Sequence, residues 1–212
     1  METTTDEGHK IWFNGDETKH QHGVGFIVNK ERVNSVISCT PINSRIITIR
    51  LSARPVNISI IHVYAPTQDY DDDRIEEFYE ELEDIIRKTP RKDLIVQGDW
   101  NAKVGPDAYQ IWAGTVGRFG LGITNDRGQR LLEFACNHNL TLAITLYPHK
   151  TSRRETWHAA DGDAENYERD AIVETFFSVK ESLDMVYFKC GFLYYLIEPL
   201  ADLISVRIFV VE

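Results

Sequence analysis

The sequence predicts an α+β or layered α/β domain with a mostly antiparallel sheet inside it. Four segments rich in β-branched residues follow one another between residues 23 and 64, separated by short turn-like pieces. An amphipathic helix, a short strand, a Gly-rich loop, a second helix and a further strand come next. Strands in succession, followed by helices and strands in alternation, are typical of sheets that are covered by helices.

The early segments are interpreted as strands because β-branched residues dominate them. In the third, Ile47, Ile49 and Leu51 share one face, which predicts a buried side. The fourth carries apolar residues on both faces, which predicts a central strand buried on both sides. The four segments span residues 23–29, 33–39, 45–52 and 56–64.

Two helices are indicated by apolar residues that recur at spacings of three and four. The first spans about 72–88; acidic residues lie at its start, where the helix dipole favours them, and Pro90 stops it. The second spans about 125–138. Further strands are predicted at 94–97 and 141–145, with weaker candidates at 184–188 and 204–211.

The composition is that of an ordinary globular protein: 212 residues, of which 42% are hydrophobic and 26% charged. We expect one domain over residues 9–212, preceded by a disordered tail at 1–8. No run of 18 apolar residues occurs, and the N-terminus lacks the features of a signal peptide. We therefore expect no membrane partner and an intracellular location, nuclear or cytoplasmic. The three cysteines lie far apart in the sequence, so we expect no disulfide framework, no disulfide-linked partner and no Cys-based zinc site. We also expect the chain to be a monomer.

The formal net charge of −10 is unevenly distributed. Residues 69–84 contain ten acidic residues and one arginine, which leaves a net charge of about −1 on the rest of the chain. The acidic average therefore describes one helix rather than the whole surface. A basic stretch at 149–154 is either a solvated loop or a phosphate-contacting loop, with Lys150, Arg153 and Arg154 as its cations.

Polar side chains follow two of the predicted buried strands. Asp99 and Asn101 come directly after the strand at 94–97 and lie two residues apart, so both point the same way if the strand continues. A carboxylate and a carboxamide can hold a water molecule, a divalent cation or a phosphate oxygen, although such residues also form ordinary strand-end turns. Tyr64 ends the strand at 56–64, where its phenol is either a phosphate donor or a rim aromatic.

Taken in order, these motifs resemble the endonuclease/exonuclease/phosphatase family, and in particular its LINE-type (non-LTR) retrotransposon endonucleases. The resemblance covers residues 9–158, and residues 159–212 diverge from it. It implies a four-layer sandwich of two mixed, mostly antiparallel sheets flanked by helices, with Mg²⁺- or Mn²⁺-dependent hydrolysis of phosphodiesters in DNA or another nucleic acid. The motifs that carry it are HGVGFIVNK (22–30), INSRIITIRL (42–51), IIHVYAPT (60–67), DLIVQGDWNAKVG (93–105), GRFGLGITNDRGQRLLEFACNHNL (117–140) and LYPHKTSRR (146–154).

The resemblance assigns roles to individual residues. Tyr64 matches a phosphate-orienting tyrosine, and Asp99 matches the aspartate that positions the attacking water. Asn101 matches the companion asparagine at the phosphate or the metal, so Asp99 and Asn101 are the implied metal ligands. Asn125 resembles a position near the scissile phosphate, and the alternative is that it caps the helix at 125–138.

The chain departs from the family pattern at both ends. The sequence seen here begins after the family's first two strands, so the fold is expected to be incomplete at the N-terminus. Glu17 imitates the pattern around the family's metal-binding glutamate, but it lies only five residues before HGVGF, where we expect a hairpin tip. Near the C-terminus Asp184 is preferred over Asp170 as the family's strand-opening aspartate, and no histidine follows residue 158. Two hypotheses follow: a retrotransposon-derived, metal-dependent endonuclease-like phosphodiesterase of impaired activity, or a catalytically inactive binding or interaction module on the same fold.

Overall fold

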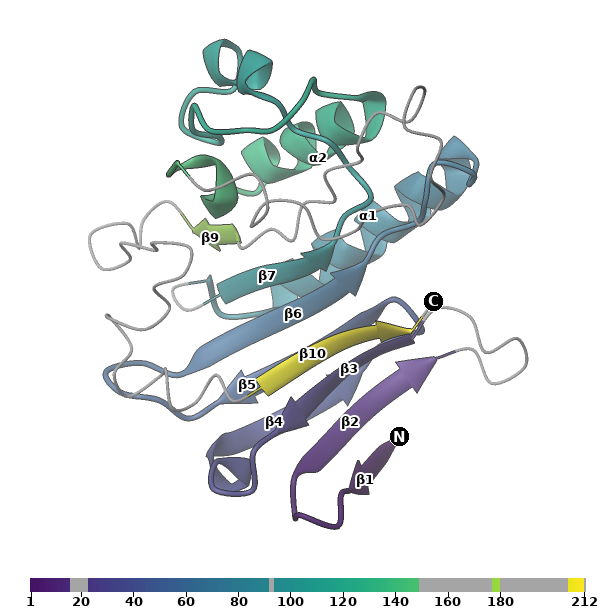
Figure 1. Ribbon diagram of the computed structural model, residues 1–212, viewed down its shortest axis with the longest axis vertical. Coiled ribbons are helices and arrows are strands. Elements are labelled where there is room, and N and C mark those ends of the chain that lie inside the picture. The colour runs from purple at the N-terminus through teal and green to yellow at the C-terminus, as the bar shows by residue number, and fades with distance from the viewer. Residues whose placement is uncertain (16–22, 92–93, 149–176, 180–205, 212) are drawn as a thin grey trace, which may run out of the picture.

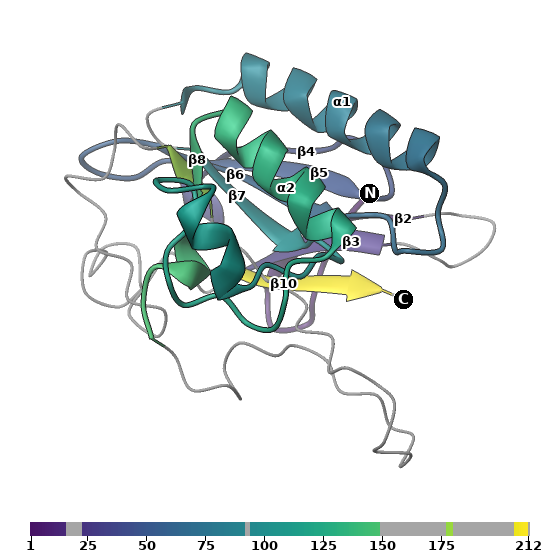
Figure 2. The same cartoon turned by 90° about the horizontal axis from the view of Figure 1, so that it is seen from above.

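Two β-sheets lie face to face, and two long helices cover the outer side of one of them (Figures 1 and 2). The computed structural model describes residues 1–15, 23–91, 94–148, 177–179 and 206–211. The four-stranded sheet has the order β1-β2-β3-β10: β1 (Glu2–Thr4), β2 (Lys10–Gly15), β3 (Gly23–Val28) and β10 (Val206–Val211). The six-stranded sheet has the order β4-β5-β6-β7-β9-β8: β4 (Val36–Pro41), β5 (Ile46–Leu51), β6 (Ile58–Tyr64), β7 (Leu94–Asp99), β9 (Phe177–Val179) and β8 (Leu140–Leu142).

The six-stranded sheet is mixed, because β6 and β7 run parallel while its other described pairs are antiparallel. The long helix α1 (Asp72–Lys88) is the crossover between these two parallel strands. It packs on the outer face of the sheet beside α2 (Asp126–Asn137), as Figure 2 shows. The predicted sandwich of two mostly antiparallel sheets with helices is confirmed. Among the described strand pairs only the six-stranded sheet is mixed, since those of the four-stranded sheet are all antiparallel.

The strand β6 joins the two cores of the molecule. All seven of its residues are buried, as its apolar sequence predicted. Ile61 and Val63 face the helices, whereas Ile58, Ile60 and Tyr64 face the four-stranded sheet. His62 is also buried and lies 6.0 Å, centroid to centroid, from the ring of Phe26 in β3. A central strand with apolar groups on both sides fixes the position of its carboxyl end.

The helix α1 has the bounds that the sequence predicted. Asp71 caps its start by accepting a hydrogen bond from the backbone N–H of Arg74 at 2.9 Å, and two further acidic residues occupy the first turn. Arg87 and Lys88 lie in its last turn. Its buried stripe packs on the sheet and consists of Ile75, Phe78, Tyr79, Leu82 and Ile86.

Other elements differ from the predictions. A disordered tail was expected at 1–8, but this is wrong for Glu2–Thr4, which pair with β2 as β1. The ammonium group of Met1 donates to the carbonyl of Phe13 at 2.9 Å, so the polar edge strand is held by contacts that no periodicity reveals. The strands predicted at 33–39 and 141–145 each include a 3₁₀ turn, at Val33–Ser35 and Ala143–Thr145. The strand predicted at 184–188 lies outside the described residues.

Candidate active site

Tyr64 and Asp99 lie side by side at the carboxyl ends of two neighbouring central strands of the six-stranded sheet. Tyr64 is the last residue of β6 and Asp99 the last of β7, and the parallel register sets one opposite the other. The pairing continues one step further, because the N–H of Ala65 donates to the carbonyl oxygen of Asp99 at 2.8 Å. The sequence therefore placed these two residues correctly at strand ends, and the register brings them together.

Gly98 makes the close approach of the two strand ends feasible. Its φ of +143° lies in a region that L-residues with a side chain rarely adopt. A Cβ atom at this position would lie 1.8 Å from the carbonyl oxygen of Val63 in the neighbouring strand. Only glycine fits here, and the residue that follows it is Asp99.

Asn101 ties the two strand ends together. Its backbone has a φ of +47°, a left-handed conformation that asparagine tolerates better than most residues. Its side-chain Nδ2 donates to the carbonyl of Ala65 at 2.7 Å, and its backbone N–H donates to Oδ1 of Asp99 at 2.9 Å. The second hydrogen bond orients the Asp99 carboxylate, which is half-buried. Trp100, which lies between Asp99 and Asn101 in the sequence, is buried in the core under the helices.

Arg45 is a member of the site that sequence reasoning missed. Its half-buried guanidinium lies 5.3 Å from the centre of the Tyr64 ring and 5.0 Å from the centre of the Tyr70 ring. Its Nη1 donates to the carbonyl of Tyr64 at 3.1 Å, and it makes no ion pair within the described residues. The only sequence signal was a cation just before a strand of β-branched residues.

Asn125 acts as the cap of α2, the second of the two roles considered for it. Its Oδ1 accepts hydrogen bonds from the backbone N–H groups of Gly128 at 2.8 Å and of Lys103 at 3.0 Å. The contact with Lys103 links the start of α2 to the loop that follows Asn101. Asn125 is thus a support of the site, and its side-chain oxygen already serves two backbone donors.

The described residues do not by themselves complete a divalent-cation site. No group of three or more His, Cys, Asp or Glu side chains in the described ranges is arranged to hold a metal ion. Asp99 supplies one carboxylate and Asn101 one amide oxygen, while the Nδ2 of Asn101 donates to the carbonyl of Ala65. The other predicted site residues, Asp184, Lys150, Arg153 and Arg154, lie outside the described residues, as do Asp170 and Glu17.

Comparisons with known proteins agree with this fold. Residues 58–161 match the family described as endonuclease-reverse transcriptase. The chain is 41% identical over 158 residues to craniofacial development protein 2 from Bos taurus, and 40% identical over 158 residues to the protein of the same name from Tragulus javanicus. These alignments cover 74% of this chain but 26% and 27% of the two relatives, so the chain spans about a quarter of the length of the curated relatives it matches.

A comparison with solved structures supports the fold described above. The 3′ phosphatase NExo from Neisseria, bound to a product DNA hairpin, matches with a TM-score of 0.54 and 17% sequence identity. The match covers 80% of this chain and 66% of that one. The resemblance to endonuclease/exonuclease/phosphatase proteins that the motifs indicated is confirmed. None of the helices in the described ranges is long and apolar enough to span a membrane.

Proposed function

We propose that this chain is an endonuclease-like phosphodiesterase domain that acts on nucleic acid, is derived from a retrotransposon endonuclease and has impaired activity. The observation that carries the proposal is the pairing of Tyr64 with Asp99 at the carboxyl edge of β6 and β7, cross-tied by Asn101. DNA is the proposed substrate, since the fold match NExo is bound to a DNA hairpin. A monomer in the nucleus or cytoplasm belongs to the same proposal.

The side chains of the site suit hydrolysis of a phosphodiester. The Asp99 carboxylate, oriented by the N–H of Asn101, accepts a proton from the attacking water as the water oxygen bonds to phosphorus. The P–O bond to the leaving sugar oxygen breaks, and that oxygen takes a proton from solvent. The Tyr64 phenol donates a hydrogen bond to a non-bridging phosphate oxygen, and the nearby Arg45 guanidinium supplies positive charge where negative charge develops. A positioned base of this kind accelerates a reaction by about 10² to 10⁴-fold.

The resemblance implies Mg²⁺ or Mn²⁺ as cofactor, with Asp99 and Asn101 among its ligands. The described residues supply only part of such a site, Asp99 and Asn101. The ion would polarise the phosphate and the attacking water, in addition to the roles of the side chains above. We propose impaired activity because residues 159–212 depart from the family pattern and contain no histidine that could act as an acid–base group. An acid–base group of this kind contributes about 10² to 10⁴ in rate.

The test is nicking of supercoiled plasmid by the full chain, with Mg²⁺, Mn²⁺ or EDTA. We expect slow nicking that requires the metal and that Asp99→Ala abolishes. Asp84→Ala is the matched control, because Asp84 is an exposed aspartate in the last two turns of α1, at the end of the helix away from Tyr70 and the strand ends. Circular dichroism shows that each variant is folded. Absence of nicking by the folded wild-type chain, or equal nicking by Asp99→Ala, contradicts the proposal.

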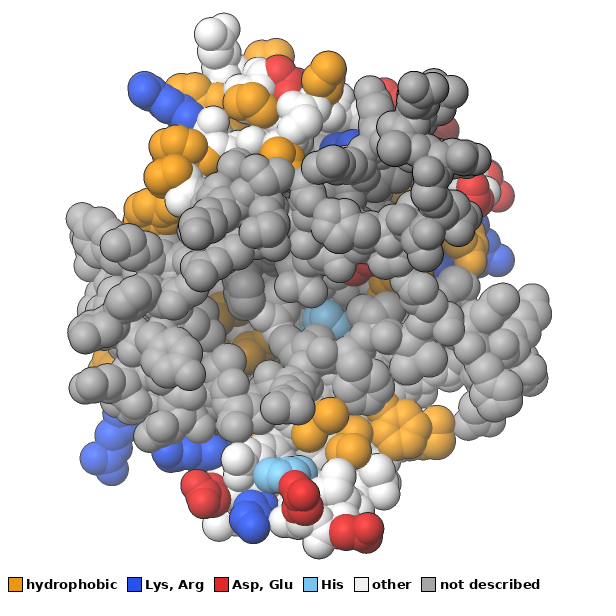
Figure 3. Space-filling model, viewed as in Figure 1, with side chains coloured by type: hydrophobic (Ala, Val, Ile, Leu, Met, Phe, Trp, Pro, Cys, Tyr) orange, Lys and Arg blue, Asp and Glu red, His pale blue; other side chains and the backbone are white. Residues whose placement is uncertain are grey.

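The alternative, an inactive interaction module, is favoured by one surface. The segment between β7 and α2 exposes large apolar side chains, with Ile111 78% and Ile123 76% exposed and Phe119 37%. Figure 3 shows hydrophobic side chains gathered at the upper end of the molecule, where Figure 1 places this segment. Apolar side chains exposed together often mark an interaction surface. A folded wild-type chain that does not nick DNA under any metal condition makes this alternative the better account.

A further inference from the structure

Arg45 is held between two tyrosines, and one of them is Tyr64 of the site. Its guanidinium contacts the faces of Tyr64 and Tyr70 and donates to the carbonyl of Tyr64. The pairing is mutual, because the N–H of Tyr64 donates to the carbonyl of Arg45 at 2.9 Å. A guanidinium over the face of an aromatic ring is attracted to it, which favours one position of that ring. Arg45 thereby links the Tyr64 ring to Tyr70.

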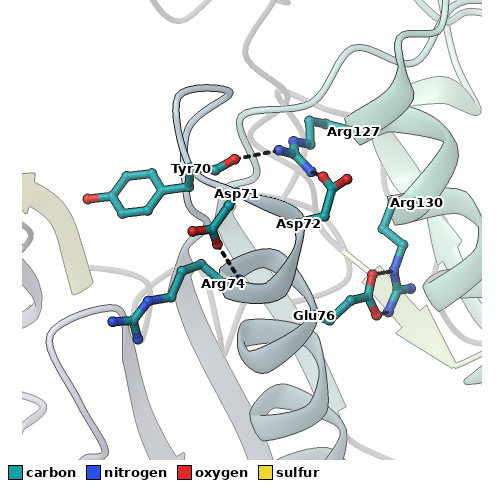
Figure 4. Close-up of polar contacts among 7 residues, drawn as sticks. All are labelled: Tyr70, Asp71, Asp72, Arg74, Glu76, Arg127 and Arg130. Atoms are coloured by element: carbon teal, nitrogen blue, oxygen red, sulfur yellow. Dashed lines mark hydrogen bonds and ion pairs between the residues drawn. The ribbon is translucent and has the colours of Figure 1, made fainter.

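Tyr70 is in turn held from the start of α2. Figure 4 shows Arg127 reaching across to the turn that precedes α1. Its Nη2 donates to the carbonyl of Tyr70 at 2.9 Å, and its Nη1 donates to Oδ1 of Asp72 at 3.0 Å. The Arg127 side chain is only 18% exposed, whereas that of Asp72 is 94% exposed. The hydrogen bond to the half-buried carbonyl is therefore the better shielded of the two contacts.

The same turn of α2 holds the other half of the site. Asn125, which caps α2, accepts a hydrogen bond from the N–H of Lys103 in the loop that follows Asn101. Gly128 allows that loop to lie close, because a Cβ there would lie 1.8 Å from the carbonyl oxygen of Lys103. The first turn of α2 thus touches both segments that carry the site: the Asp99 loop directly, and Tyr64 through Tyr70 and Arg45.

We infer that Arg127 is a positioning residue for the site: through Tyr70 and Arg45 it fixes the ring of Tyr64 beside Asp99. As far as catalysis is concerned, this inference rests on the proposed function. The positioning itself is a property of the folded chain. It does not require that the chain cleave anything.

Arg130 provides a matched comparison. It lies one turn further along α2 and forms a bidentate ion pair with Glu76 of α1, with both N···O distances at 2.6 Å (Figure 4). It also lies 4.3 Å from the centre of the Tyr79 ring. Both arginines therefore join α2 to the α1 segment. Arg127 alone of the two contacts Tyr70, so loss of Arg130 loosens the helices without releasing Arg45.

The experiment follows the Tyr64 ring by NMR in the full chain labelled with ¹³C in its tyrosine rings. Tyr64→Phe identifies the Tyr64 signals. We expect Arg127→Ala to shift or broaden them and Arg130→Ala to leave them at the wild-type positions. Arg127→Lys keeps a charge near Asp72 but loses the planar fork that reaches Tyr70. It is the variant to use if Arg127→Ala does not fold, and we expect it to move the Tyr64 signals too.

Unmoved Tyr64 signals in the folded Arg127 variants, or equal changes in Arg130→Ala, overturn the inference. Where the wild-type chain nicks DNA, we also expect Arg127→Ala to lower kcat by about 10- to 100-fold with little change in KM, since misplacement of a reacting group acts on the chemical step. Moved signals without any nicking by the wild-type chain leave the positioning intact and reject the proposed function. Nicking by the wild-type chain together with unmoved Tyr64 signals in the Arg127 variants supports the proposed function and overturns the positioning role of Arg127.

Discussion

At the scale of single residues, the site depends on backbone conformations that few residue types tolerate. Gly98 is the clearest case, because the space for its side chain is filled by the carbonyl of Val63. Gly122 is a useful contrast: its φ is +70°, but a Cβ there would meet nothing within 4 Å. Replacing each glycine by alanine therefore distinguishes two free-energy costs: at Gly122 only the strain of a positive φ, and at Gly98 that strain together with a steric clash.

We predict that Gly98→Ala destabilises the fold by more than about 4 kcal/mol, because the clash forces β6 and β7 apart. Gly122→Ala costs only about 1 kcal/mol, the strain of a positive φ. Urea unfolding followed by circular dichroism measures both values. Similar losses in the two variants contradict the idea that β6 and β7 need Gly98 for their close contact.

His62 is a second residue with a predictable effect. Burial lowers its pKa from the ordinary 6.5 to about 4. His62 therefore binds a proton below about pH 6.5 in the unfolded chain but only below about pH 4 in the folded chain. The free energy of unfolding falls as the pH drops through this window. The stability is fully present above pH 6.5.

We predict that the wild-type chain loses roughly 2 kcal/mol more stability between pH 7 and pH 5 than His62→Leu does. The leucine variant keeps an apolar side chain against Phe26 and removes the titrating group. Urea unfolding at the two pH values gives the comparison, and the difference between the proteins cancels the contributions of other groups. Equal pH dependence in both proteins means that His62 is not buried as a neutral group.

At the scale of elements, α1 and α2 are joined by charges as well as by their apolar core. The acidic surface of α1 is partly used in this way, because Glu76 pairs with Arg130 and Asp72 with Arg127. The hydrogen bonds from Arg130 hold the pKa of Glu76 below its usual value. The concentration of acidic residues in 69–84 therefore serves the packing of the helices in part.

We predict that Arg130→Ala costs about 1 to 2 kcal/mol, since it removes a bidentate pair and a stacking contact with Tyr79. Arg74→Ala is the matched control, because Arg74 forms an exposed pair with Glu77 within α1. It should cost less than about 0.5 kcal/mol. The free energy of unfolding in urea at low salt decides between them, and equal costs would show that the contact between helices adds nothing.

At the scale of the whole molecule, the sequence was informative where signals are local. The ends of α1 follow from Asp71 and Pro90, and the burial of β6 follows from its apolar residues. The resemblance predicted Tyr64, Asp99 and Asn101 as one site, and the register of β6 and β7 brings Tyr64 and Asp99 together. Arg45 was missed because its contacts with Tyr64 and Tyr70 depend on how strands and turns meet in space. The strand at Glu2–Thr4 was missed because its three residues are polar and exposed.

The central claim is that the paired strand ends of β6 and β7 form a working, metal-dependent site. Its most direct test is the rate of plasmid nicking by wild-type chain and Asp99→Ala over one Mg²⁺ concentration series. We predict a rate that rises with Mg²⁺ and falls by about 100-fold or more in Asp99→Ala. Equal rates in the two proteins, or a wild-type rate that EDTA leaves unchanged, would contradict the claim.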